Sequence, residues 1–295
     1  MKAPLPLIEG VAPSRQTLPA GRWKTVLEFL AERFPAVGRA AWLERMERGL
    51  VVDESGARLD AASSYRVGAC VFYYRELEAE RSVPFEERVV YRDAHLLVVD
   101  KPYFLPVVPA GRYLRESLLV RLRRRGMPEQ LAPVHRIDRE TAGLVLFCLD
   151  PAARGLYTSL FRERRVRKVY EALVGTTAGH EFPLERRSRI VPGEPFFRMK
   201  EAEGEPNSET LIELVGEQAG GTALLRVEPL TGRKHQVRLH LSALGMPIVN
   251  DRLYPVVWPE EEDDFSRPLK LLAKSLSFTD PLTNEERHFE SDRAL

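Results

Sequence analysis

Apolar residues at helical spacing mark two short helices near the start of the chain, on either side of Pro35. Residues that recur every three or four positions lie on one face of a helix. The second pattern ends close to Gly49, a residue that commonly terminates helices. The apolar positions are Val26, Leu27, Leu30 and Phe34 in the first helix and Trp42, Leu43, Met46 and Leu50 in the second.

Residues 51–74 predict a small sheet after these helices. Val51-Val52, a turn-like Glu54-Ser55-Gly56 and the run 65–74 are rich in β-branched and aromatic residues, as strands are. Before the helices, residues 1–22 contain several prolines and no period, which indicates an extended arm. Residues 79–88 are charged and polar and predict a linker. We therefore expect an arm (1–22), a small α/β domain (23–78), the linker (79–88) and a larger domain (89–295).

The larger domain is expected to contain a mixed, largely antiparallel sheet of the α+β class. Few helical patterns separate its apolar runs, chiefly residues 114–125 and 152–163, so regular alternation of strands and helices is not indicated. The runs of strand length are residues 95–99, 142–147, 170–174 and 222–227.

Length and composition favour a cytoplasmic protein with no membrane segment. No apolar run in the 295 residues approaches the roughly 18 needed to cross a bilayer, and the first residues lack the apolar core of a signal peptide. Cys70 and Cys148 lie in apolar runs outside any paired-cysteine motif. We expect them to be buried and reduced, without a disulfide or a zinc site.

The charge is uneven although the net charge is only +1. Residues 110–170 hold 14 lysines and arginines against 6 aspartates and glutamates, an excess that would attract a polyanion. The alternative is that the arginines of 121–125 form the solvated face of a helix. The acidic run 260–264 offsets much of the excess and is expected to be a surface loop.

Residues 135–143 form a polar segment that runs directly into an apolar strand. Asp138 lies in it between Arg136 and Arg139, whose charges would keep the carboxylate ionised. An ionised carboxylate can act as a nucleophile or a base. The alternative from the residues alone is a structural aspartate that caps a turn or pairs with one of these arginines.

Residues 236–241 alternate between polar and apolar and predict a strand. Gln236, Arg238 and His240 would then form its polar face. A metal site is not expected, because His235 and His240 would point to opposite sides of the strand. The glycine spacing of a phosphate-binding loop is also missing.

Four motifs in order make the chain resemble the RluA-type RNA pseudouridine synthases. The signature is His135-Arg136-Ile137-Asp138 followed by Thr141-Ala142-Gly143, where the family has His-Arg-Leu-Asp-x-x-Thr-Ser-Gly. The resemblance extends from about Val89 to the C-terminus. The other motifs are Leu97-Val98-Val99-Asp100-Lys101-Pro102, Arg167-Lys168-Val169-Tyr170, and Thr231-Gly232-Arg233-Lys234-His235-Gln236-Val237-Arg238 with Gly245-Met246-Pro247-Ile248-Val249-Asn250-Asp251.

The resemblance implies an eight-stranded mixed sheet with a central RNA-binding cleft, and the isomerisation of uridine to pseudouridine without cofactor or metal. Asp138 would be the essential carboxylate and Arg238 its salt-bridge partner. Tyr170 would stack on the detached uracil and assist proton transfer at carbon 5. Arg136 would fill the gap left by the flipped uridine. The further residues expected to bind RNA are Arg139, Lys168, Arg233, Lys234, His235 and Gln236.

Three questions stay open at this stage. Residues 23–78 resemble a degenerate αL RNA-binding domain, with Trp23-Lys24-Thr25 where that domain usually has Arg-Leu-Asp, so a packing role is an alternative. Residues 186–207 either reach the substrate through Pro195-Phe196-Phe197 or form a hairpin on the domain edge. The substrate would be structured ribosomal or transfer RNA, bound by a monomer; the alternative is an inactive RNA-binding paralogue that assists ribosome assembly.

Overall fold

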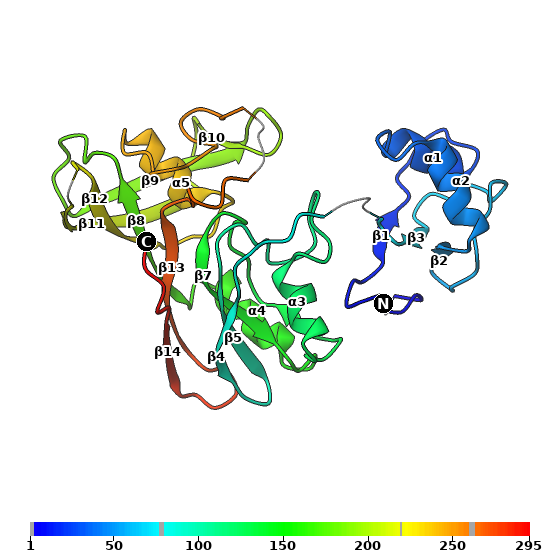
Figure 1. Ribbon diagram of the computed structural model, residues 1–295, viewed down its shortest axis with the longest axis horizontal. Helices are drawn as coiled ribbons and strands as arrows, with labels where there is room; N and C mark the ends of the chain where they lie inside the picture. Colours follow the sequence, from blue (N-terminus) through cyan, green and yellow to red (C-terminus); the bar gives the residue numbers. More distant parts are fainter. Residues whose placement is uncertain (1–2, 77–79, 219, 260–262) are drawn as a thin grey trace. The chain divides into compact units, whose positions relative to one another are not determined.

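Two β-sheets organise the chain, each in a unit of its own (Figure 1). The computed structural model describes residues 3–76, 80–218, 220–259 and 263–295. The first unit comprises Met1–Glu80 with Gly111–Arg115, and the second comprises Arg81–Ala110 with Glu116–Leu295. Within the described residues, no helix is long and apolar enough to cross a membrane.

In the first unit, two short helices share an apolar core with a three-stranded antiparallel sheet. Thr25 and Glu28 form a capping box that satisfies the first backbone N–H groups of the leading helix. The predicted helices and small sheet are thus confirmed. The elements are α1 (Val26–Arg33), α2 (Arg39–Glu47) and, in sheet order, β1 (Ser14–Thr17), β3 (Cys70–Tyr73) and β2 (Val51–Asp53).

The segment expected to be an extended arm contributes to this sheet instead. β1 pairs antiparallel with β3, from Ser14 opposite Tyr73 to Thr17 opposite Cys70. Leu18, directly after β1, is 1% exposed and belongs to the core. A strand of four residues is too short to show a clear period, so the hydropathy pattern did not reveal it.

One sheet of eleven strands runs through the second unit (Figure 1). Its pairings are antiparallel except that of β13 with β7, which confirms the mixed, largely antiparallel sheet, although eight strands were expected. The main path is β10 (Met199–Ala202), β9 (Leu184–Pro192), β11 (Ser208–Glu217), β12 (Ala223–Pro229), β8 (Arg167–Val174), β13 (Leu271–Thr279), β7 (Ala142–Cys148), β5 (Leu96–Lys101) and β4 (Arg88–Arg92), with β14 (Glu286–Glu290) beside β13 and β6 (Ala132–Pro133) beside β7.

Burial explains why β7 and the first four residues of β5 are continuous apolar runs. Every residue of β5 and β7 is buried, so neither strand alternates with polar positions. Tyr157 and Leu160 of α4 (Arg154–Arg162) pack against them in one core cluster. Cys148 is buried in the same cluster as a free thiol, as expected. The predicted helix over 114–125 is found as α3 (Leu118–Arg124).

Two expectations about charged surfaces need correction. Arg121 of α3 is largely buried and pairs with Glu87 and Glu116, so the arginine run is not simply a solvated face. In the acidic run 260–264, residues 260–262 lie outside the described residues. Asp263 is only 4% exposed and forms an ion pair, so at this position the run is not a surface loop.

The parallel pairing of β7 with β13 depends on Gly143. The two strands pair at Ala142 with Leu272 and at Gly143 with Ala273. Gly143 has a φ of +112°, and a Cβ atom there would lie 2.2 Å from the Ala273 carbonyl oxygen. No side chain fits at this crossing, which explains the glycine after Ala142.

Replacing Gly143 with alanine should therefore destabilise the protein by about 2 kcal/mol, since it combines backbone strain with a steric clash. Urea denaturation measures the change. Gly155→Ala in α4 is the matched control, because nothing lies within 4 Å of a Cβ there and alanine favours helices. A Gly143→Ala protein as stable as the wild type would contradict this explanation.

The segment predicted as a strand over 236–241 is a helix, α5 (Gln236–Ala243), so that prediction is wrong. All six of these residues are buried. A helix buried on every side carries no single apolar stripe. Its N-cap is His235 with a φ of 56°, which is not one of the usual capping residues. Both sequence signals of a helix are therefore missing.

The sequence argument against a metal site assumed that His235 and His240 lie on opposite sides of a strand. Because this segment is a helix, that argument no longer applies. His240 faces hydroxyl groups: its Nε2 lies 3.0 Å from the hydroxyls of Ser188 and Ser208, and its Nδ1 lies 2.8 Å from that of Thr210. In the part of the chain that the structure describes, no group of three or more His, Cys, Asp or Glu residues could hold a metal ion. The polar side of α5 is instead a hydrogen-bonded contact with β9 and β11.

Candidate active site

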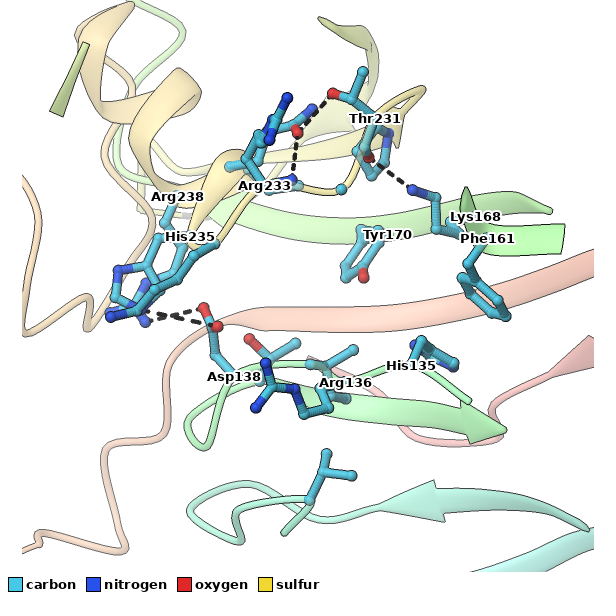
Figure 2. Close-up of a pocket in the computed structure, with 18 of the residues that line it drawn as sticks. His135, Arg136, Asp138, Phe161, Lys168, Tyr170, Thr231, Arg233, His235 and Arg238 are labelled. Carbon is cyan, nitrogen blue, oxygen red and sulfur yellow. Dashed lines mark hydrogen bonds and ion pairs between the residues drawn. The ribbon is translucent and has the colours of Figure 1, made fainter. Parts of the chain in front are cut away.

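A cavity of about 1070 Å³ lies in the second unit, beside the loop that carries Asp138 (Figure 2). Its walls come from the loop before β7, the end of α4, β8 and the segment that leads into α5. The structure brings all the predicted site residues together here. Those that line the cavity are Arg136, Asp138, Arg139, Lys168, Tyr170, Arg233, Lys234, His235, Gln236 and Arg238.

Asp138 lies in the loop between β6 and β7, with its side chain 24% exposed. One carboxylate oxygen, Oδ2, accepts a hydrogen bond of 3.3 Å from Nη1 of Arg238. The other oxygen, Oδ1, lies 3.9 Å from Nε2 of His235. Figure 2 shows both partners approaching the carboxylate from the same side. The opposite side faces the cavity and is open to a ligand.

Arg238 is enclosed by carboxylates and is only 1% exposed. Its Nε and Nη2 donate to the two oxygens of Asp251 at 2.8 and 2.7 Å, and its Nη1 also lies 3.6 Å from Glu140. Burial alone would lower the pKa of Arg238, but the hydrogen bonds and charge of Asp251, with the charges of Asp138 and Glu140, raise it above its ordinary value. The guanidinium is a permanent cation with a fixed orientation.

His235 bridges Asp138 and Tyr254. Its Nδ1 lies 3.0 Å from the Tyr254 hydroxyl, which also accepts a hydrogen bond from the Met199 backbone at 2.8 Å. Burial lowers the pKa of His235, so the ring is neutral at pH 7. A lone pair on Nε2 would face the Asp138 carboxylate, which favours the tautomer with its hydrogen on Nε2 and with Nδ1 accepting from Tyr254.

Tyr170 extends from β8 into the same cavity (Figure 2). Its neighbours across the sheet are Val227 of β12 and Ala273 of β13. Burial raises the pKa of Tyr170, and the negative charge of Asp138 raises it further. The phenol is therefore protonated at neutral pH and presents an uncharged ring to the cavity.

Lys101, at the end of β5, is hydrogen-bonded to the loop that carries Asp138. It is fully buried, and its Nζ donates to the carbonyl oxygens of Pro102 at 2.9 Å and Arg139 at 3.1 Å. Burial lowers the pKa of Lys101 to about 7, although the charges of Glu140 and Asp138 oppose the shift. The ammonium thus ties the end of β5 to the residue after Asp138.

The low pKa of Lys101 predicts a pH-dependent stability. The unfolded chain binds one more proton than the folded chain between pH 7 and roughly 10, so stability rises with pH across this window. The unfolding free energy of the wild type should therefore increase, relative to that of Lys101→Met, by up to about 1.4 kcal/mol per pH unit. Urea denaturation of both proteins from pH 7 to 10 measures the difference, and a constant difference would contradict the shift.

Comparisons with known proteins agree on one family. The family model described as RNA pseudouridylate synthase matches residues 95–243. An uncharacterised RNA pseudouridine synthase of Synechocystis sp. is 30% identical over 230 residues, which cover 78% of this chain and 79% of that protein. The dual-specificity RNA pseudouridine synthase RluA of Escherichia coli K12 is 35% identical over 210 residues, with coverages of 69% and 91%. Human RNA pseudouridylate synthase domain containing 1 matches with a TM-score of 0.58 and 28% identity, over 73% of this chain and 86% of that one.

The chain belongs to the RluA family of RNA pseudouridine synthases. It is therefore an isomerase that acts on RNA, and the resemblance drawn from the four motifs is confirmed. Asp138, Tyr170 and Arg238 all lie inside the matched residues 95–243.

One wall of the synthase cavity contains a stacked pair of rings. The centroids of His135 and Phe161 lie 4.4 Å apart, with 17° between the ring planes. Burial, aided by the charge of Lys168, lowers the pKa of His135 to about 3, and its Nε2 accepts a hydrogen bond from the Leu146 backbone at 3.0 Å. This neutral imidazole fixes the start of the Asp138 loop against β7.

Two predicted RNA-binding residues of the synthase are engaged internally. Arg139 donates to both oxygens of Asp263, at 2.7 and 3.0 Å, and to Glu140 at 3.0 Å. Gln236 is 4% exposed and hydrogen-bonds the hydroxyls of Thr231 and Thr210. These contacts favour a role in holding the site together over a direct contact with RNA.

Exposed cations surround the mouth of the cavity. Those that the sequence predicted are Arg136, Arg233 and Lys234. Lys168, also predicted, is held inside by a 2.7 Å hydrogen bond to the Thr231 carbonyl.

Three residues that line the cavity at and just after the end of α4 were not predicted from the sequence. The charge excess of residues 110–170 included two of them but gave no means of selecting them from the other arginines. The three are Phe161, Arg162 and Arg164.

Proposed function

We propose that this synthase converts uridine to pseudouridine in structured ribosomal or transfer RNA, with Asp138 as its catalytic carboxylate. The observation that carries the proposal is the pairing of Asp138, at the cavity, with the buried guanidinium of Arg238. The charge-assisted hydrogen bond from Arg238 fixes the position of the Asp138 carboxylate beside the cavity. Asp251 holds that cation in place from the other side.

The proposed reaction breaks the bond between N1 of uracil and carbon 1′ of the ribose, turns the base, and forms a bond between carbon 5 and carbon 1′. The hydrogen on carbon 5 then leaves as a proton and N1 gains a proton, so the step is an isomerisation. Asp138 either attacks the substrate or removes the proton at carbon 2′, and both routes need its negative charge. Tyr170 would stack on the detached uracil. Because burial keeps its phenol protonated, Tyr170 is better suited to hold the ring than to act as a base.

Access to the uridine requires that it leave the base stack. Arg136 is exposed beside Asp138 and would occupy the gap in the RNA. Arg233 and Lys234 would contact phosphates, together with Arg162 and Arg164. Contacts of this kind release counterions, so we expect RNA affinity to fall steeply as salt concentration rises. We propose a cytoplasmic location for this activity, because its substrate is RNA and the relatives include bacterial proteins.

Mapping pseudouridines in ribosomal and transfer RNA from cells with and without the gene tests the proposal. At least one site should disappear, and the purified protein should restore it on RNA from the deficient cells. Unchanged maps, together with RNA binding by the protein, would instead support an inactive paralogue that assists ribosome assembly.

A further inference from the structure

The loop that joins β9 to β10 carries two adjacent phenylalanines in different settings. Phe197 is half-buried and lines the cavity. Phe196 is 89% exposed, more than any other large apolar side chain in the described part of the chain. The two rings meet edge to face, with centroids 5.5 Å apart and planes at 76°. Phe196 therefore stands at the edge of the cavity without a place in the core.

The loop is hydrogen-bonded to residues that precede α5 or lie close to the cavity. Lys234 donates from Nζ to the Phe197 carbonyl at 2.8 Å, so the loop is tied to the segment before α5. Arg198 donates to the Pro255 carbonyl at 2.8 Å, and its guanidinium carbon lies 4.8 Å from the centroid of the Tyr254 ring. Tyr254 is the residue that contacts His235. The position of Phe196 is thus coupled to the groups around Asp138.

An aromatic ring exposed to water gains stability when a flat partner covers it. The cations at the cavity mouth favour an anionic partner, and one of them, Lys234, is hydrogen-bonded to this loop through the Phe197 carbonyl. An RNA base satisfies both conditions, because every base has a π face and each is attached to a phosphate. Only an unpaired base offers that face, since bases within a duplex cover one another.

We propose that Phe196 stacks on an unpaired base of the RNA next to the uridine that enters the cavity. The inference rests on the proposed function for the RNA class and extends it to a specificity-determining residue. It requires that the uridine have a neighbour outside the helix. Because any base can stack, Phe196 would select the local shape of the RNA more than its sequence.

Binding of a stem-loop RNA with one loop uridine flanked by adenosines tests the proposal. Phe196→Ala should weaken binding about 5- to 150-fold, the range for losing one base stacked on an aromatic ring. Phe196→Trp should keep wild-type affinity. Replacing the flanking adenosines one at a time by an abasic residue should identify one position where wild type and Phe196→Ala bind equally. Fluorescence anisotropy measures each affinity.

Val215→Ala is the matched control, since Val215 is 58% exposed and does not line the cavity. It should bind every RNA as the wild type does. Unchanged affinity of Phe196→Ala, an equal loss on every abasic RNA, or no wild-type binding to the stem-loop would each overturn the proposal. The pseudouridine maps of cells with and without the gene are measured separately. Unchanged maps would contradict the proposed function but would not change the result on stacking by Phe196.

Discussion

Asp138→Asn is expected to abolish pseudouridine formation, with a loss on the order of 10⁴-fold or more. Asparagine has almost the same shape and can still accept the hydrogen bond from Arg238. It carries no negative charge, however, and neither route from uridine can begin without one. Tritium release from RNA labelled at carbon 5 of uracil measures the activity.

Affinity separates this chemical effect from a structural one. The Asp138→Asn protein should bind the substrate RNA about as tightly as the wild type, by fluorescence anisotropy. Asp292→Asn is the control, because its side chain is 75% exposed and lies outside the cavity; it should keep full activity. Product formed by Asp138→Asn at a rate near that of the control would rule out Asp138 as the essential carboxylate.

Asp251→Ala is expected to reduce the unfolding free energy by about 3–5 kcal/mol, because it leaves a buried arginine without its bidentate partner. Asp251 is 3% exposed and also accepts from the backbone N–H groups of Leu253 and Tyr254. Urea denaturation measures the loss. The same substitution at the exposed Asp292 should have little effect.

If the Asp251→Ala protein does not fold, Asp251→Asn provides the measurement, since it keeps hydrogen bonds but removes the charge. That variant should unfold at a lower urea concentration than the wild type. Its activity should also fall, because Arg238 would no longer be held against Asp138. Wild-type stability in both variants would mean that the Arg238–Asp251 pair does not support this part of the fold.

Local patterns predicted those parts of the fold that local physics determines. The fully buried strands β5 and β7 were visible as apolar runs, and α1 was visible through its apolar face. The order of four motifs led to the family and to the ten residues that line one cavity. Each of these inferences used residues that are neighbours in the sequence or in a known order.

The rest depends on contacts between distant segments. Asp138 and Arg238 are 100 residues apart, and Tyr254 was not predicted to contribute to the site at all. α5 was misread because its polar residues are paired inside the protein, so that its polar and apolar positions do not separate into two faces. No single sequence shows which buried polar residue will have a partner.

The narrow pairing of β7 with β13 has a mechanical consequence for the site. Asp138 precedes β7, whereas Arg238 belongs to a helix packed on β10, β11 and β12, on the far side of that pairing (Figure 1). A small bend at this two-residue pairing would change the distance between the Asp138 carboxylate and the Arg238 guanidinium, even if the strands on either side kept their shape. The 3.3 Å contact between Asp138 and Arg238 thus depends on the angle at which the two parts of the sheet meet.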